Sequence, residues 1–184
     1  MTFTATKRIA TVAAALVVGA LSMPIGAASA SVARQPEGKT VTDYVTFYGY
    51  TDNNPPGRAI THSCIHPDGA GGTGTYLDPV TYAQGDDNGP WCQILYVPFL
   101  KKYFIHEDSE CGDECTSASK HHIDLWMGGD KNSVKNPEKD ALLDCEDQWT
   151  QDKTPVILSP PKNEPVDKTP LFTPPKTCHG GQGD

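Results

Sequence analysis

The sequence has little positive charge and few long apolar runs, and each deficit excludes a class of function. Its 184 residues contain 15 lysines and arginines against 23 aspartates and glutamates, for a net charge of −8. Nucleic acid and anionic lipid surfaces repel such a chain, so we expect neither as a partner, whereas a neutral polymer is not repelled. Beyond residue 30, no segment approaches the roughly 20 apolar residues of a transmembrane helix, and we expect no membrane span.

The sequence also lacks the motifs of common cofactor and metal sites. Residues 69–75, GAGGTGT, miss the Gly-Lys-Ser/Thr ending of a phosphate-binding loop, so we interpret them as a turning loop. The polar cluster 106–108 with His121 and His122 lies on expected strands, where neighbouring side chains point to opposite faces and do not converge on one ion. We therefore expect no metal and no cofactor.

The first 30 residues have the features of a secretory signal peptide. Lys7 and Arg8 precede an apolar run over 9–21, and the small residues Ala28-Ser29-Ala30 suit a cleavage site. We expect a secreted, extracellular protein whose mature chain begins with a flexible segment, residues 31–40.

Six cysteines follow this segment, and an even number in an exported chain predicts three disulfides. Fifteen pairings are open. We favour the nearest-neighbour set, with Cys111–Cys115 the most plausible pair. A zinc site at that pair lacks a second matched pair of ligands. The cysteines are Cys64, Cys92, Cys111, Cys115, Cys145 and Cys178.

The patterns along the rest of the chain favour a mainly β domain over 41–150. Strands are expected at 41–49 and 121–127, and a hairpin joins 93–97 to 103–106. One short helix fits the Asn136 cap, the first-turn Pro137 and the apolar spacing that ends at Trp149. The proline-rich composition of 151–184 predicts an extended tail, tied to the domain by Cys178. Many short strands with one or two short helices indicate a small β-barrel.

The stretch HHIDLWMGG, residues 121–129, is the strongest candidate site. Alternation along a strand places Ile123, Leu125 and Met127 on a core face and the other set on the opposite face. That opposite set contains His122, Asp124 and Trp126. An aspartate beside a surface tryptophan is typical of carbohydrate sites, where a ring meets the sugar face and a carboxyl meets the glycosidic oxygen.

Three motifs in order, TFYG (46–49), FIHEDSEC (104–111) and HHIDLWMGG, resemble the double-psi β-barrel of several secreted families. These are the expansins, barwin-type proteins, rare-lipoprotein-A-type proteins and family 45 endoglucanases. The stretches TFYGYTDNNPPG and YVPFLKKYF are similar to uncharacterised secreted fungal and actinomycete proteins. The resemblance covers residues 41–145 and implies a six-stranded double-psi barrel.

The resemblance also implies roles for individual residues. Asp124 matches the general acid of the hydrolases and the polysaccharide-contacting aspartate of expansins, while Thr46 and Tyr48 match groove residues. Asp108 matches an aspartate that either lines the groove or bonds loop amides. The second catalytic carboxylate has no match at its usual place, where Gly49 stands, and the next acid is Asp52.

We therefore expect a monomeric secreted protein that binds, loosens or hydrolyses a β-linked cell-wall polysaccharide. In the enzymatic version, a glycoside hydrolase or lytic enzyme, Asp124 is the acid and Asp52 the base; in the expansin-like version Asp124 only binds. The alternative is a protease inhibitor or barwin-like defence protein acting through loops 51–57 and 66–75. A structural wall protein without a specific ligand is the third interpretation.

Overall fold

A computed structural model of the protein describes residues 38–53, 55–85, 89–109, 122–133 and 141–179. The expected signal peptide, the Cys111–Cys115 pair, and the cap and first turn of the helix lie outside these ranges. Within them, no helix combines the length and apolar character that a bilayer span requires.

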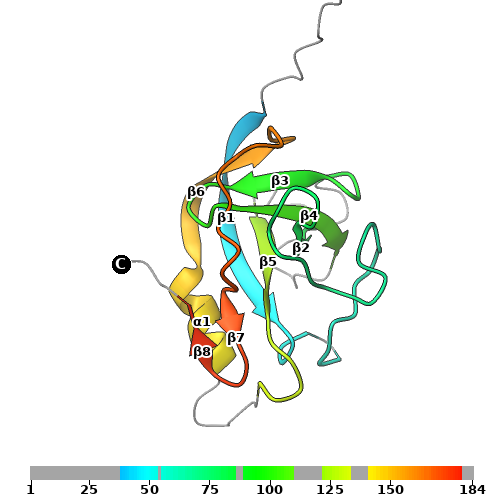
Figure 1. Cartoon of the computed structure of the whole chain (residues 1–184), viewed down its shortest axis with the longest axis vertical. Coiled ribbons are helices and arrows are strands. Elements are labelled where there is room, and N and C mark those ends of the chain that lie inside the picture. The colour runs from blue at the N-terminus through cyan, green and yellow to red at the C-terminus, as the bar shows by residue number, and fades with distance from the viewer. Residues whose placement is uncertain (1–37, 54, 86–88, 110–121, 134–140, 180–184) are drawn as a thin grey trace, which may run out of the picture. The chain divides into compact units, whose positions relative to one another are not determined.

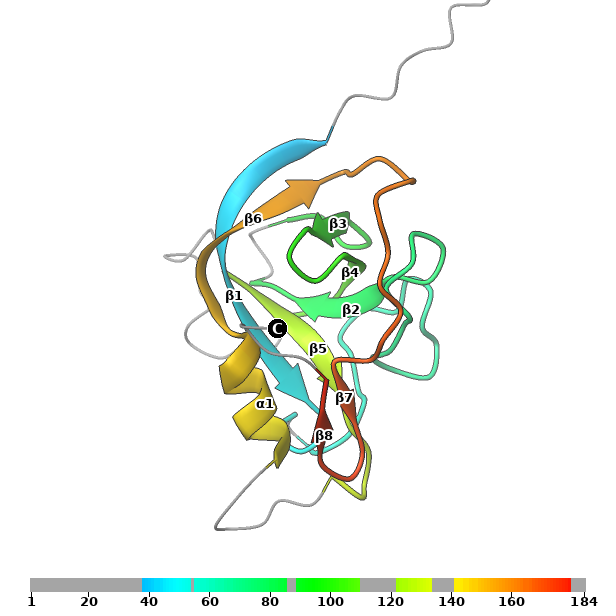
Figure 2. The same cartoon turned by 60° about the vertical axis from the view of Figure 1, so that its left-hand side comes forward.

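Six strands close into a barrel, in the order β1-β5-β2-β4-β3-β6 (Figures 1 and 2). The barrel strands are β1 (Lys39–Gly49), β2 (Val80–Ala83), β3 (Ile94–Val97), β4 (Lys102–Asp108), β5 (His122–Gly128) and β6 (Gln151–Leu158). The helix α1 (Ala141–Trp149) and the hairpin of β7 (Phe172–Thr173) and β8 (Thr177–Cys178) lie side by side at one end of the barrel. The fold is thus mainly β with a single short helix in the described part, as predicted.

The pairing relates the first three strands to the last three by a two-fold pattern. β1 pairs in parallel with β5 and antiparallel with β6. β4 correspondingly pairs in parallel with β2 and antiparallel with β3. Exchanging the two halves therefore leaves the strand order of the closed six-stranded barrel unchanged.

The barrel interior is filled by the alternate apolar residues of its strands. Val45 and Phe47 of β1 lie in register with Ile123 and Leu125 of β5, and all four are buried. β-branched and aromatic side chains suit such a pleated surface, so the expected first and fifth strands form where the alternation predicts them. The predicted hairpin is confirmed as β3 and β4, with Lys101 at φ 51° in its turn.

The C-terminal boundary expected after residue 150 lies inside the barrel. Residues 151–158 form β6, whose Val156 is fully buried, and the proline-rich segment begins only afterwards. Pro155 misled the prediction because proline donates no backbone hydrogen bond and is rare in central strands. Here it pairs with Thr42 beside an irregularity in the β1–β6 register.

Two of the favoured disulfides are confirmed. Cys64 is bonded to Cys92, and Cys145 to Cys178, with Cα–Cα distances of 5.6 and 5.5 Å. The second bond joins α1 to β8 and so anchors the C-terminal segment, as expected. Tyr103 and Tyr96 hold an earlier part of the same segment, since their hydroxyls donate to the Pro161 and Pro165 carbonyls.

Candidate functional site

The strand register brings the predicted site residues into one row across four strands. Thr46 of β1 lies opposite Asp124 of β5, and Asp124 lies opposite Ala83 of β2. Ala83 in turn lies opposite Asp108 of β4. We call Thr46, Tyr48, Asp108 and Asp124 the carboxylate row. Two carboxylates separated by one strand share this row, although they are 16 residues apart in the sequence.

The Thr46 hydroxyl connects His122 to Asp124. It donates to Asp124 Oδ1 over 2.8 Å and lies 2.8 Å from His122 Nε2. A hydroxyl carries one proton, so with that proton on Asp124 the contact to His122 requires Nε2–H as the donor. These two hydrogen bonds orient the Asp124 carboxylate between β1 and β5.

The Tyr48 hydroxyl bridges the row. It donates to Asp108 Oδ2 over 3.1 Å, and the ring packs edge-on against Trp126 with centroids 5.3 Å apart. Burial, and then the negative charges of Asp108 and Asp124, raise the pKa of Tyr48 well above its ordinary value. Tyr48 therefore stays a neutral donor, with both carboxylates acting on its hydroxyl.

Asp108 is held by four donors. Its Oδ1 accepts from Thr61 N, Thr61 Oγ1 and Ser109 N at 3.0–3.2 Å, and its Oδ2 accepts from Tyr48. A carboxylate oxygen has two lone pairs, so Oδ1 is fully engaged by its three donors, while Oδ2 accepts from Tyr48 alone. Asp108 thus accepts from the loop amides of Thr61 and Ser109, which is one of the two roles expected for it. It also contacts Tyr48 of the carboxylate row.

The expected outward face of β5 is only partly open. His122 and Trp126 are 3% and 5% exposed, because rings of β1 cover them: Tyr44 packs on His122 at 4.7 Å, and Tyr48 packs on Trp126. Asp124 and Thr46 are the half-buried members. The prediction of a solvent-facing tryptophan is therefore wrong, and Asp124 and Thr46 are more accessible than His122 and Trp126.

Asp52 caps the end of β1. Its carboxylate accepts from Gly49 N over 2.7 Å, three residues beyond Thr46 along the strand. With about 3.3 Å of rise per residue, this places the Asp52 carboxylate about 10 Å along β1 from the Thr46–Asp124 contact. The strand register thus brings Asp108, and not Asp52, into the row with Asp124.

A second polar cluster escaped the sequence analysis. The buried Glu107 carboxylate accepts from three consecutive backbone amides, Cys64, Ile65 and His66, at 2.8–3.1 Å. It also lies 2.5 Å from His66 Nδ1, and His66 Nε2 lies 3.4 Å from Asp78. A charged residue inside the apolar run of β4 was the available signal, but its partners lie about 40 residues away.

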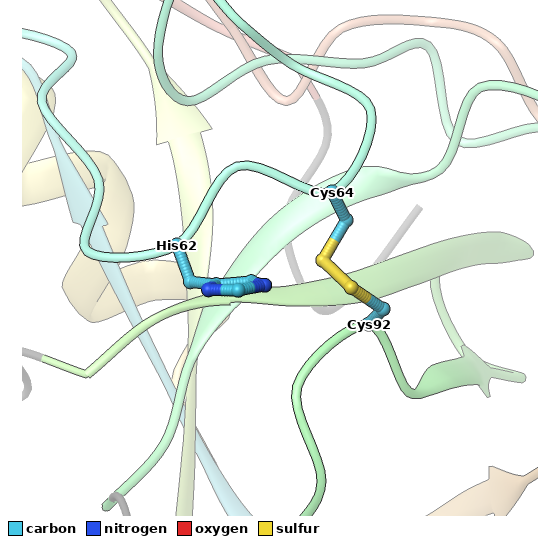
Figure 3. Close-up of side chains that lie close together, drawn as sticks. All are labelled: His62, Cys64 and Cys92. Carbon is cyan, nitrogen blue, oxygen red and sulfur yellow. A yellow bond between two sulfur atoms is a disulfide. The ribbon is translucent and has the colours of Figure 1, made fainter.

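A third group, His62 with Cys64 and Cys92, has ligand atoms within 4.8 Å of one another (Figure 3). The two sulfurs are bonded to each other, so in this oxidised form they are not thiolate ligands for a metal. His62 instead stacks on Trp91, with centroids 5.1 Å apart.

Two pockets open elsewhere on the described part of the chain. The larger, of about 770 Å³, lies between the start of β3 and residues 159–163; the smaller, of about 350 Å³, lies beside Trp149 and Leu171. Neither is lined by Asp124. Sequence reasoning missed the larger pocket because residues 90–94 and 159–163 are distant in the chain.

Comparison with known proteins identifies a family for almost the whole described chain. Residues 39–179 match the family described as the DDB_G0273701 N-terminal domain. An uncharacterized protein of Dictyostelium discoideum, DDB_G0273701/DDB_G0273221, is 37% identical over 136 residues, which cover 73% of this chain and 57% of that protein. The chain thus spans little more than half the length of this relative. No solved structure matches it significantly. The chain belongs to the DDB_G0273701 N-terminal domain family.

Proposed function

We propose that this member of the DDB_G0273701 N-terminal domain family is a secreted protein that binds a neutral cell-wall polysaccharide at the carboxylate row. The observation that carries the proposal is the strand register that brings Asp124 and Asp108 into one row, where Thr46 donates to Asp124 and Tyr48 to Asp108. Carboxylates make strong, charge-assisted hydrogen bonds to sugar hydroxyls. A neutral glycan also avoids the repulsion that a chain of net charge −8 imposes on anionic polymers.

The accessible groups of the row suit a sugar ring. Asp124 and Thr46 are half-buried, so a ligand reaches them, and both are oriented by bonds within the barrel. Strand-mounted groups positioned in advance bind with a smaller loss of side-chain freedom than groups on loops. The row therefore has the rigidity of a binding site.

Binding without hydrolysis is the version that the geometry favours. An inverting glycosidase needs a base about 6.5–9.5 Å from the acid and a water between them. Asp108 lies two strand spacings, about 10 Å, from Asp124 at the backbone, but it is only 3% exposed and is held by four donors, which disfavours its use as a base for that water. Asp52 is engaged with Gly49 at the end of β1. We infer an expansin-like role for Asp124.

Asp124→Asn is expected to weaken binding at least tenfold in sedimentation assays with insoluble β-glucan, chitin and peptidoglycan. The change keeps the shape of the side chain but removes the charge that strengthens hydrogen bonds to sugar hydroxyls. Reducing-sugar release is expected to stay at the level of the blank for both proteins. Asp144→Asn, the same change on an exposed helical residue, is the control and is expected to bind like the wild type.

Two results would count against this proposal. Sugar release by the wild type that disappears in Asp124→Asn identifies a hydrolase instead of a binding protein. Equal sedimentation of Asp124→Asn and the wild type, or no sedimentation with any of the three polymers, removes the carboxylate row as the contact surface.

A second candidate function, protease inhibition or defence through a loop, is favoured by Leu77. This side chain is 89% exposed at the tip of the turn closed by the Thr75–Asp78 bridge. The Asp78 carbonyl accepts from Thr73 N and Gly74 N at 3.0 Å, and its carboxylate accepts from Thr73 N. A rigid turn that presents an apolar side chain is preorganised to enter a pocket of another protein.

Leu77→Asp is expected to abolish inhibition in this second function, because a charge does not enter an apolar pocket without a large desolvation cost. The measurement is residual activity of papain-type and subtilisin-type endoproteases titrated with the protein. Leu143→Asp, at a 47% exposed site on α1, is the matched control. If the wild type inhibits neither enzyme class, or Leu77→Asp inhibits as well as the wild type, this candidate is withdrawn.

A further inference from the structure

The pocket of about 770 Å³ has the size of a small-ligand site, which usually occupies about 300–1,000 Å³. One wall comes from the residues that lead into β3, and the other from the segment that follows β6. The two walls are joined by the Ser159 N to Ile94 O hydrogen bond, 3.1 Å long. The lining residues are Tyr76, Pro90, Trp91, Cys92, Gln93, Ile94, Ser159, Pro160, Pro161, Lys162 and Asn163.

The pocket differs from the rest of the chain in charge. Among the described residues, its lining has one ammonium group, Lys162, and two amides, Gln93 and Asn163, but no carboxylate, in a protein of net charge −8. The Lys162 ammonium lies 5.0 Å from the centre of the Tyr76 ring, so an aromatic face holds the cation. Glu164 follows the pocket segment and is not one of the lining residues. The lining therefore favours an anionic ligand.

Trp91 lines the pocket as part of a stack of rings. Its indole stacks on His62 at 5.1 Å and on His106 at 4.4 Å, and His106 stacks in turn on Tyr82 in the barrel interior. These contacts hold the indole in place. The edge of an aromatic ring is electropositive, so an indole edge attracts ligand oxygens.

The strands behind the pocket argue against an acidic peptide as the ligand. β3 is hydrogen-bonded on one side to β4 and on the other to β6, so it offers no open edge for an added strand. The lining instead supplies separate hydroxyl and amide groups from Tyr76, Ser159, Gln93 and Asn163. Such groups match the many hydroxyls of a sugar ring.

We propose that this pocket binds a uronic acid unit of an acidic oligosaccharide. Lys162 pairs with the carboxylate, the Trp91 edge faces ligand oxygens, and the two amides bond ring hydroxyls. None of these residues belongs to the carboxylate row, so the proposal stands independently of the polysaccharide-binding function. The two sites together would give the protein a neutral and an acidic glycan contact.

Calorimetric titration with oligogalacturonate and with its methyl ester tests the proposal on the full chain. We expect the wild type to bind the acid at least tenfold more tightly than the ester, and Lys162→Gln to lose most of this preference. Lys162 is exposed, so its replacement is expected to leave the fold intact. Lys168→Gln, another exposed lysine outside the pocket lining, is the control and should titrate like the wild type.

Three outcomes would overturn the proposal: no binding by the folded wild type, equal affinity for acid and ester, or an unchanged preference in Lys162→Gln. Tighter binding of oligoglutamate than of oligogalacturonate would assign the pocket to acidic peptides instead. Asp124→Asn is expected to bind oligogalacturonate like the wild type. A loss of polysaccharide binding at the carboxylate row can therefore be distinguished from a loss of binding at this pocket.

Discussion

Replacing Glu107 with alanine is expected to lower the free energy of unfolding by about 3–5 kcal/mol, because it removes a buried carboxylate that accepts several hydrogen bonds at once. The carboxylate fills a nest of three consecutive amides in the loop 64–66 and receives the Thr81 hydroxyl at 3.0 Å as well as the contact to His66. Backbone amides arranged in this way form an anion-binding concavity. Without the carboxylate, the partly buried amides and the buried Thr81 hydroxyl lose this acceptor, and a buried donor left without an acceptor costs about 1–3 kcal/mol.

Urea unfolding followed by circular dichroism measures this effect. Glu107→Gln is expected to fall between the wild type and the alanine variant, because one amide oxygen can still accept from the loop. Asp152→Asn, which removes an exposed carboxylate from β6, is the control and is expected to change the stability little. A loss below about 1 kcal/mol in Glu107→Ala, the worth of one ordinary hydrogen bond, would show that the loop does not depend on this carboxylate.

The same carboxylate predicts the direction of the pH dependence. Burial alone raises the pKa of Glu107, but the bonds from Ile65 N, His66 and Cys64 N outweigh it and leave the pKa below its ordinary value. The pKa of Asp78 is also lowered: burial opposes the shift, and bonds from Thr73 and His66 outweigh it. Because the unfolded chain then binds protons more readily, their stabilisation is complete above the unfolded pKa, near 4, and is lost as the pH falls through the folded pKa. Glu107→Gln should flatten this acid-side decline.

Replacing Cys64 and Cys92 together with serine is expected to cost about 3–4 kcal/mol, because the bond closes a loop of 28 residues in the unfolded chain. In a domain of this size the melting temperature should fall by about 10–20 °C. The bond also joins the loop that cradles Glu107 to the residue beside Trp91. Its loss is therefore expected to loosen both the amide nest and the ring stack of Tyr82, His106, Trp91 and His62.

The double serine variant at Cys145 and Cys178 separates these two effects. It opens a loop of 33 residues, so the loss of unfolded-state constraint is nearly the same. Near-ultraviolet circular dichroism reports the packing of the aromatic stack and should weaken only in the Cys64/Cys92 variant. Identical spectra and identical losses in the two variants would mean that the Cys64–Cys92 bond has no specific role in holding the stack.

The periodicity of apolar residues was enough to predict the strands and the helix in which that pattern is uninterrupted. β1, the β3–β4 hairpin, β5 and α1 all lie where alternation or helical spacing placed them, since an element that buries one face needs apolar residues at its own repeat. β2 was missed because its four residues follow a glycine-rich loop and carry too little pattern. β6 was taken for a tail because the proline at 155 concealed the inward Thr154 and Val156.

The candidate site divides in the same way. Motif order and strand alternation identified six residues, and the structure places them on β1, β5 and β4, with β2 between the last two strands: Thr46, Tyr48, Asp108, His122, Asp124 and Trp126. The sequence did not reveal that the rings of Tyr44 and Tyr48 cover His122 and Trp126. Nor did motif order reveal that Asp108 accepts from four donors, two of them from Thr61, 47 residues earlier in the chain.

From the sequence alone came the mainly β class, the barrel and the two confirmed disulfide pairs, because each rests on residue type, short-range spacing or motif order. The tertiary structure decided which carboxylates share a row, which side chains remain accessible, and where a pocket without carboxylates opens. These properties depend on strand register and on contacts between distant segments. A one-residue shift in register would turn every side chain of a strand to its other face, and no local pattern specifies which strands meet.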